Sequence, residues 1–233
     1  MLSMTFPDLS KPEEILPQIA LLDKEYPGMF RWMGEVNLVK QALFNNGHKA
    51  VPGEVIAAWK PFMEELRRRN IPIAIHSDLG NDRDPKKYIP LMDEVLRRYP
   101  DNRIVWMHLG LSKELTTVDP REHIQLLESY LRRYPNLSFD ISWRVLYDQM
   151  FKDPAKRALY VAFMNRWPSR FIPGTDFVAA AGKTEQIYRE ELIVTSSILA
   201  DVNNEAFRRI ALGQNYFELA GLDAVAPPVC LKK

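Results

Sequence analysis

Five residues of the types that bind metals or move protons stand at matching points along the chain: Glu35, His76, His108, Asp140 and Asp176. Each follows a short apolar run, such as IPIAI before His76. Imidazole nitrogens and carboxylate oxygens together form the mixed donor set that suits zinc, with manganese or iron as alternatives. A divalent ion held by them would lower the pKa of water to about 7, and a neighbouring carboxylate would pass the released proton to a leaving group.

The segments that lead to these residues share one layout, which predicts repeated β–α units. A helical stretch ends at a proline and a short apolar run follows; the prolines are Pro27, Pro72, Pro100, Pro135 and Pro168. Proline cannot continue a helix and favours extended backbone at the residue before it. The intervals between the polar residues suit parallel strands joined by crossover helices, since a βαβ unit takes roughly 30 residues or more.

The layout predicts an α/β fold, with helices over 12–26, 54–69, 85–99, 120–134, 154–167, 184–200 and 203–212 and strands near 2–6, 30–35, 72–76, 103–108, 137–142 and 170–175. The chain contains no GxGxxG or GxxxxGK[ST] sequence, which argues against a doubly wound nucleotide-binding sheet and against a phosphate-binding α/β protein. A barrel brings the carboxyl ends of its strands to one face. We therefore expect a (β/α)8 TIM-barrel-like domain over residues 1–233, incomplete at about six units.

Alternation along the expected strands aims the polar side chains to one side of the sheet. His76 shares a face with Ala74, and His108 is expected to share a face with Trp106. Asp140 follows the same rule in the strand near 137–142. The expected site thus lies inside the barrel at its carboxyl end.

Three short motifs resemble the strand ends of the amidohydrolase superfamily of metal-dependent (β/α)8 hydrolases: HSDLG at 76–80, HLG at 108–110 and GTD at 174–176. The resemblance covers most of residues 30–222 and implies that the visible strands are the third to the eighth. It implies metal ligation and substrate activation by the following residues: Glu35 as a fourth-strand carboxylate, His76 as a fifth-strand ligand, His108 as a second-metal ligand or substrate-orienting catalytic group, and Asp176 as the eighth-strand ligand and general base.

One departure from the family pattern bears on activity. The family's first strand carries an HxH pair of ligands, and this chain contains no HxH. We therefore expect that the first two strands are absent from this polypeptide and that metal binding is weakened or lost. The open edges would need cover from a rearranged terminus or from a homo-oligomer. The alternatives to a hydrolase are an inactive truncated barrel used for binding or assembly, and a metal-assisted decarboxylase of the same superfamily.

Further polar residues have two interpretations each. Arg144 is a candidate for binding a substrate carboxylate or phosphate, with a surface ion pair as the alternative. Asp78 is a substrate-binding candidate or a loop cap, and Trp143 is a substrate contact or core packing. Lys40 is an alternative to Glu35 as a carbamylated bridge, and His48 lies in a loop that would meet substrate. The remaining histidine, within PREHIQLL, is expected to be structural: His123.

The composition excludes several classes of partner. Lys and Arg number 31 against 30 Asp and Glu, a formal net charge of +1, so no basic field favours nucleic acid or an anionic membrane. No apolar run approaches the ~18 residues of a membrane span, and no secretory signal is present. The single cysteine, Cys230, cannot form an internal disulfide, which favours the reducing cytoplasm. We expect a small-molecule substrate.

Overall fold

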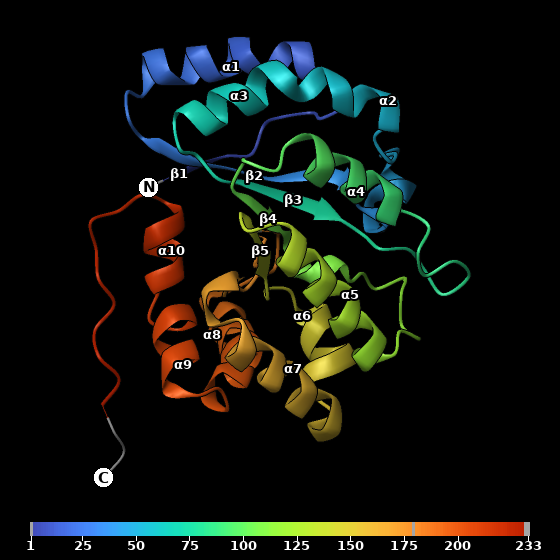
Figure 1. Cartoon of the computed structure of the whole chain (residues 1–233), viewed down its shortest axis with the longest axis vertical. Coiled ribbons are helices and arrows are strands. Elements are labelled where there is room, and N and C mark those ends of the chain that lie inside the picture. Colours follow the sequence, from blue (N-terminus) through green and yellow to red (C-terminus); the bar gives the residue numbers. More distant parts are fainter. Residues whose placement is uncertain (1, 179, 231–233) are drawn as a thin grey trace.

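The strands form one parallel sheet that curves without closing (Figure 1). The computed structural model describes residues 2–178 and 180–230. The strands follow chain order across the sheet: β1 (Leu2–Met4), β2 (Phe30–Val39), β3 (Ile73–Ser77), β4 (Ile104–Trp106), β5 (Leu137–Asp140) and β6 (Phe171–Ile172). Within the described residues β1 and β6 each pair with a single strand, so the α/β fold and the incomplete barrel are confirmed.

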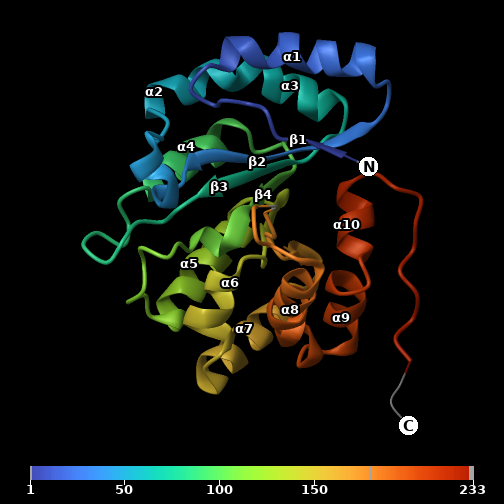
Figure 2. The ribbon, with the colours of Figure 1, turned by 180° about the vertical axis from the view of Figure 1, so that it is seen from behind.

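Helices cover the convex side of the sheet, and Figures 1 and 2 show α1 and α3 side by side over β1 and β2. The chain begins several helices at proline, where the missing N–H costs no hydrogen bond. The helices are α1 (Pro12–Glu25), α2 (Gly53–Ile56), α3 (Lys60–Arg68), α4 (Ile89–Arg98), α5 (Pro120–Arg133), α6 (Arg144–Leu146), α7 (Pro154–Arg166), α8 (Glu185–Ser196), α9 (Asn204–Ile210) and α10 (Gln214–Leu219). No helix among the described residues is long and apolar enough to cross a bilayer.

The main hydrophobic core lies between the sheet and its helices. Trp106 of β4 packs edge-on against Tyr130 of α5 at 5.4 Å, and Phe171 of β6 packs against Phe163 of α7 at 5.0 Å. All four side chains are almost fully buried. Burying a large apolar side chain contributes about 1.5–3 kcal/mol, so this layer holds the strands at the spacing that positions their carboxyl ends.

The concave side of the sheet carries a smaller apolar cluster that contains Ala74, Val105 and Ile172. Helix α10 covers the amino ends of the strands, where Tyr216 stacks on Trp32 with ring centroids 5.8 Å apart. A hollow of about 290 Å³ remains on this concave side. The interior of the open barrel is therefore partly filled near the amino ends of the strands and stays accessible at their carboxyl ends.

Three expectations about strand ends were wrong. Glu35 does not end its strand, because β2 continues to Val39 with a register shift between Met33 and Val36. His108 does not share a face with Trp106, which points into the helix-side core. Strand β4 stops at Trp106, and left-handed backbone follows it, with φ of 54° at His108.

The last strand is also shorter than the predicted 170–175. Strand β6 contains only Phe171 and Ile172, and Asp176 follows in the GTD loop with φ of 53°. The left-handed backbone at Asp176 means that strand alternation cannot set the direction of its side chain.

Candidate metal centre

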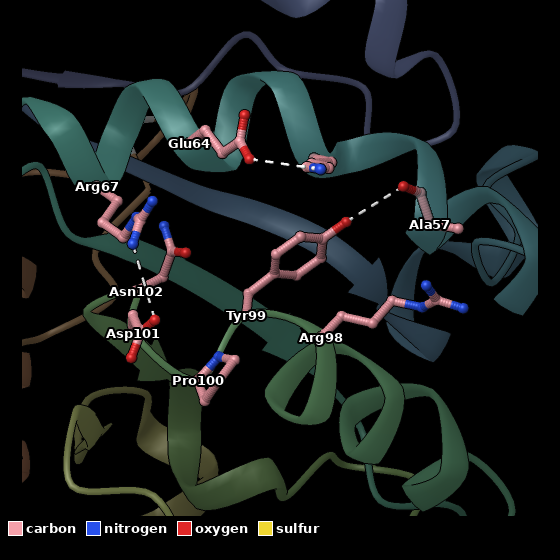
Figure 3. A pocket seen from close by; sticks show the side chains of 9 residues that line it. Ala57, Glu64, Arg67, Arg98, Tyr99, Pro100, Asp101 and Asn102 are labelled. Carbon is pink, nitrogen blue, oxygen red and sulfur yellow. Dashed lines mark hydrogen bonds and ion pairs between the residues drawn. The ribbon is translucent and has the colours of Figure 1, made fainter.

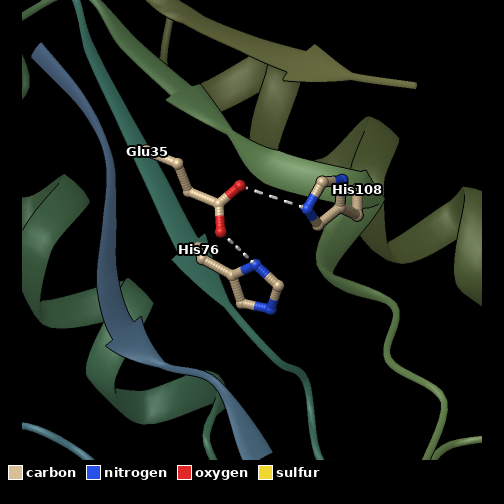
Figure 4. Close-up of side chains that lie close together, drawn as sticks. All are labelled: Glu35, His76 and His108. Carbon is tan, nitrogen blue, oxygen red and sulfur yellow. Dashed lines mark hydrogen bonds and ion pairs between the residues drawn. The ribbon is translucent and has the colours of Figure 1, made fainter. Parts of the chain in front are cut away.

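Three donor side chains from neighbouring strands meet at the carboxyl end of the sheet (Figure 4). Glu35 comes from β2, His76 from β3, and His108 from the turn after β4. The Nδ1 atom of His76 lies 3.0 Å from Oε1 of Glu35, and Nε2 of His108 lies 3.4 Å from Oε2 of Glu35. One ligand atom from each residue falls within 4.8 Å of the others, which is the spacing that a shared ion requires.

Local backbone geometry explains how His108 reaches this cluster. His108 and Leu109 both have positive φ, at 54° and 55°, and Gly110 follows at 72°. This left-handed turn rotates the imidazole away from the direction that a continuing strand would give it. His123 of α5 donates from Nε2–H to the carbonyl oxygen of Leu109 at 2.9 Å, which fixes the turn from outside.

Each histidine of the cluster is held from behind by a buried carboxylate. Nε2–H of His76 donates to Oδ1 of Asp78 at 2.9 Å, and Nδ1 of His108 forms an ion pair with Oδ1 of Asp140 at 2.9 Å. The hydroxyl of Ser142 also donates to Asp140, at 2.7 Å. Carboxylates in this position fix the ring tautomer and make the opposite nitrogen a better metal ligand. The free nitrogen of each ring consequently faces Glu35.

Charges inside the cluster are strongly coupled. Burial alone would raise the pKa of Glu35, but hydrogen bonds from His108 and His76 outweigh it and hold that pKa below its ordinary value. Burial alone would lower the pKa of His108, but hydrogen bonds to Asp140 and Glu35 raise it to about 10. Lys40 adds a further cation by pairing with Oε1 of Glu35. Without a metal, the imidazolium and the ammonium therefore balance the carboxylates.

Asp176 lies beside this cluster without belonging to the three-residue set. Its Oδ2 atom lies 4.0 Å from Nε2 of His108, which places both side chains at one opening. Burial raises the pKa of Asp176, the charge of His108 opposes that rise, and Glu35 adds to it. A carboxylate with a raised pKa is a better proton acceptor near neutral pH.

The expected substrate-binding residues have different surroundings. The Trp143 ring lies 5.0 Å from that of His108, so it forms a wall of the site. Asp78 is buried and engaged by His76 and by the backbone N–H of Gln41 at 2.7 Å, so it positions a histidine and has no open face for a substrate.

The guanidinium of Arg144 is occupied by two carboxylates. It pairs with Asp148 at 3.2 Å and with Glu191 at 3.3 Å, and the side chain is exposed. This arrangement matches the surface ion pair that was the alternative interpretation. Nothing in the geometry supports Arg144 as a substrate ligand.

Sequence reasoning included Asp140 among the five donor residues and did not place Ser142 in the site. The signal was present in LSFDIS, where Ser138, Asp140 and Ser142 alternate with apolar residues and so share one face. What alternation alone could not show is the partner, since Asp140 reaches His108 from the neighbouring strand.

The donor set fits a divalent transition metal. Nε2 of His108 is buried, and the carboxylate oxygens of Glu35 and Asp176 lie 3.4 Å and 4.0 Å from it, so it faces two further donor groups. Two imidazoles and a carboxylate with room for a fourth ligand match the open coordination of catalytic zinc sites. Glu35, His76 and His108 are therefore suited to hold such an ion.

A separate hollow of about 390 Å³ lies outside the sheet, between α3 and the segment that joins α4 to β4 (Figure 3). Its charged groups pair with one another, as Arg67 does with Asp101 at 3.7 Å. The hydroxyl of Tyr99 donates to the carbonyl oxygen of Ile56 at 2.6 Å. These contacts explain the lining as surface packing and give this hollow no reactive group.

Known solved structures share this fold at low sequence identity. An amidohydrolase from Burkholderia multivorans with bound zinc aligns with a TM-score of 0.56 at 15% identity, over 94% of this chain and 72% of that one. Dihydroorotase from Campylobacter jejuni aligns with a TM-score of 0.54 at 14% identity, over 96% of this chain and 64% of that one. A probable 2-pyrone-4,6-dicarboxylic acid hydrolase from Acinetobacter baumannii, with citric acid bound, aligns with a TM-score of 0.52 at 17% identity, over 94% and 72%.

A family model provides the more specific comparison. No curated protein matches the chain. The model described as amidohydrolase matches residues 26–191, which include Glu35, both site histidines and Asp176. That match covers most of the chain and agrees with the fold of the solved structures. The chain belongs to the amidohydrolase family.

Proposed function

We propose that this chain is a metal-dependent hydrolase that cleaves a C–N or C–O bond of a small molecule with water. One observation carries the proposal: two buried histidines, each held by its own carboxylate, turn their free nitrogens toward a single glutamate. Glu35, His76 and His108 would hold a divalent ion, zinc first and manganese or iron as alternatives, with Asp176 beside them as a further ligand. Such an ion supplies Lewis-acid polarisation and acidifies water at neutral pH.

The chain's own residues would move the protons and shape the site. Asp176 would accept a proton from the attacking water and return it to the leaving group, in keeping with its raised pKa. His108, held by Asp140, would keep its Nε2 atom aimed at the reacting centre. The Trp143 ring would exclude bulk water from the two imidazoles.

Metal analysis tests the proposed centre directly. The purified chain is dialysed against zinc and then against metal-free buffer, and bound metal is measured per chain. We expect one ion for the native chain and for His48→Gln, whose exposed ring has no contact with the cluster. Glu35→Gln and His108→Asn should retain far less. Equal metal content in all four proteins would contradict the proposed ligands.

Turnover tests the chemistry. A panel of lactones, cyclic amides and N-acyl acids is incubated with the zinc-loaded chain, and released acid is measured. Asp176→Asn should abolish hydrolysis of any substrate found, and the metal content of the same sample is measured beside it. Release of carbon dioxide without hydrolysis would favour the decarboxylase alternative. A metal-free, inactive chain would favour the binding or assembly module.

We also propose that the chain self-associates in the cytoplasm through its open sides. The side of β1 exposes Leu2 and Met29, and helix α8 exposes Tyr188 and Ile193, so both flanks of the opening carry apolar surface. Exposed strand edges and apolar patches favour association. The free thiol of Cys230 is consistent with a reducing compartment. Sedimentation equilibrium should find a dimer or larger species, and a stable monomer would contradict this.

A further inference from the structure

A third hollow, of about 690 Å³, opens beside the metal centre at the carboxyl ends of β1 and β2. It lies between residues 5–10, which follow β1, and residues 46–52, which lead from β2 toward α2. Its volume falls in the range of about 300–1,000 Å³ that is typical of small-molecule sites. Sequence reasoning named two residues of its lining as candidates: Lys40 as a carbamylated bridge, and His48 as a loop residue that would meet substrate.

Two residues connect this hollow to the metal centre. Lys40 lines the hollow and its Nζ atom pairs with Oε1 of Glu35. Asn37 also lines it and stands in register with His76 on the neighbouring strand. The Oδ1 atom of Asn37 is buried and has no hydrogen-bond partner among the described residues. A buried amide without a partner is costly, so this atom is placed to meet a bound molecule.

One cation of the lining is placed to meet a ligand with a single negative charge. Lys40 and Lys49 supply two cations, and Asp8 supplies the one carboxylate. Asp8 is already engaged by the backbone and hydroxyl of Ser10, at 3.0 Å and 2.6 Å. Lys49 is exposed and makes no ion pair within residues 2–178 and 180–230. Glu35 neutralises Lys40, and Asp8 offsets Lys49 in net charge without forming an ion pair with it, so Lys49 is the cation of the lining that has no direct acidic partner among the described residues.

The lining also contains apolar side chains beside its polar ones. Phe6, Val51 and Pro52 contribute hydrocarbon surface to the hollow, and Val51 is almost fully buried. Apolar walls with a few directed polar groups are the usual composition of a small-molecule site. The ligand that matches both features has an apolar body and one acidic group.

We propose that this hollow binds an organic monocarboxylate with an apolar body, and that such acids are the substrate class of the metal centre beside it. Lys49 would bind the carboxylate, Phe6 and Val51 would contact the body, and Oδ1 of Asn37 would accept a hydrogen bond from the N–H of an amide to be cleaved. This inference rests on the proposed hydrolase function for its link to catalysis. The binding of the acid itself does not require a metal.

The test uses benzoate as the probe and neutral benzamide as its isostere. Binding of each to the full metal-free chain is measured by titration with saturation-transfer NMR. We expect benzoate to bind roughly tenfold more tightly than benzamide, because a charge-assisted hydrogen bond is lost with the charge. Lys49→Met should weaken benzoate binding roughly tenfold, and Lys49→Arg should restore most of it. Lys24→Met, at an exposed position of α1, is the matched control and should bind as the native chain does.

Several results would overturn the inference. Equal binding of benzoate and benzamide would remove the role of charge. Equal losses in Lys49→Met and Lys24→Met would remove the role of this hollow. Displacement of benzoate by inorganic phosphate at lower concentration than by acetate would show a phosphate site instead. Zinc content of Lys49→Met should stay native, so failure of the metal centre and failure of this acid site are separate results.

Discussion

Two buried histidines of this chain have contrasting surroundings. His108 stands between carboxylates, with Asp140 at Nδ1 and Glu35 facing Nε2. His123 has neutral partners, and the hydroxyl of Tyr160 donates to its Nδ1 at 2.7 Å. Their exposed fractions are 0% and 2%, so depth in the protein does not distinguish them.

The pKa values of His108 and His123 shift in opposite directions because their hydrogen-bond partners differ in charge. Burial lowers the pKa of His123 to about 4, and its hydrogen bond to the Leu109 carbonyl recovers only part of that shift. Burial acts in the same direction on His108, but its carboxylate partners reverse the shift and raise the pKa to about 10. Charged partners rather than depth therefore separate a site histidine from a structural one. The two are also linked, because His123 anchors the turn that carries His108.

The largest effect that this comparison predicts is on metal affinity as a function of pH. His108 must lose its proton before Nε2 can bind a metal, and its pKa is about 10. Affinity should therefore rise about tenfold per pH unit, or about 1,000-fold from pH 6 to pH 9. Zinc affinity measured against a chelator of known pH dependence checks this. An affinity that is flat over that range would show that His108 is neutral or is not a ligand.

The next largest effect concerns stability at acidic pH. The folded-state pKa of His123, about 4, lies below its unfolded value of about 6.5. The unfolded chain therefore binds the proton first as pH falls, and His123 opposes folding progressively from pH 6.5 to 4. We compare the free energy of unfolding of the native chain with that of His123→Gln. Relative to the variant, the native chain should lose about 3 kcal/mol of this free energy as the pH falls from 6.5 to 4.

Urea unfolding at pH 7 and at pH 4 measures that difference, and carboxylates common to both proteins cancel. Gln retains an N–H for the Leu109 carbonyl, so the turn that carries His108 should persist. His48→Gln is the control, because it makes the same substitution at an exposed position. A difference between native and His123→Gln proteins that stays constant with pH would contradict the neutral, buried state of His123.

The order of strands and the identity of the main donors could be predicted from the sequence because both follow from local rules. Prolines end helices, apolar runs of strand length follow, and alternation in IPIAIH places His76 opposite the core. The route of His108 could not be predicted, since it depends on left-handed backbone at a non-glycine residue that α5 stabilises from outside. Asp176 follows the same pattern, with its side chain directed by a loop conformation. Tertiary contacts decide such turns, and no local signal encodes them.

The hollow of about 690 Å³ could not be predicted from the sequence for the same reason. Asn37 and Lys49 belong to segments with no distinctive motif, and they become neighbours only when the loops after β1 and β2 fold together. Arg144 is a further case, because the sequence left open a substrate contact or a surface ion pair and the fold supplied two carboxylate partners. Side-chain pairing across segments is therefore the step that residue types and spacing leave open.

A smaller effect should follow from weakening the support of His108. Asp140→Asn keeps the shape of the side chain and removes its charge, so Nδ1 of His108 loses a charged acceptor. Zinc affinity at pH 9 should fall roughly 10–100-fold, and the pH above which affinity stops rising should move down. Asp93→Asn, whose carboxylate accepts from the Tyr130 hydroxyl at 2.7 Å in the helix-side core, is the matched control and should bind zinc normally. Similar affinities in the two variants would show that Asp140 does not tune the site.

The smallest effect should come from removing the hydroxyl group that hydrogen-bonds to His123. Tyr160→Phe removes the hydroxyl that donates to Nδ1 of His123 and leaves that nitrogen buried without a donor. Unfolding free energy at pH 7 should fall by about 1–2 kcal/mol, while zinc affinity stays within a factor of about two of the native value. Urea unfolding and chelator competition on the same sample measure both quantities. A loss of zinc affinity comparable to that of Asp140→Asn would mean that the turn at His108 depends on this hydroxyl, so that the two histidines form one functional unit.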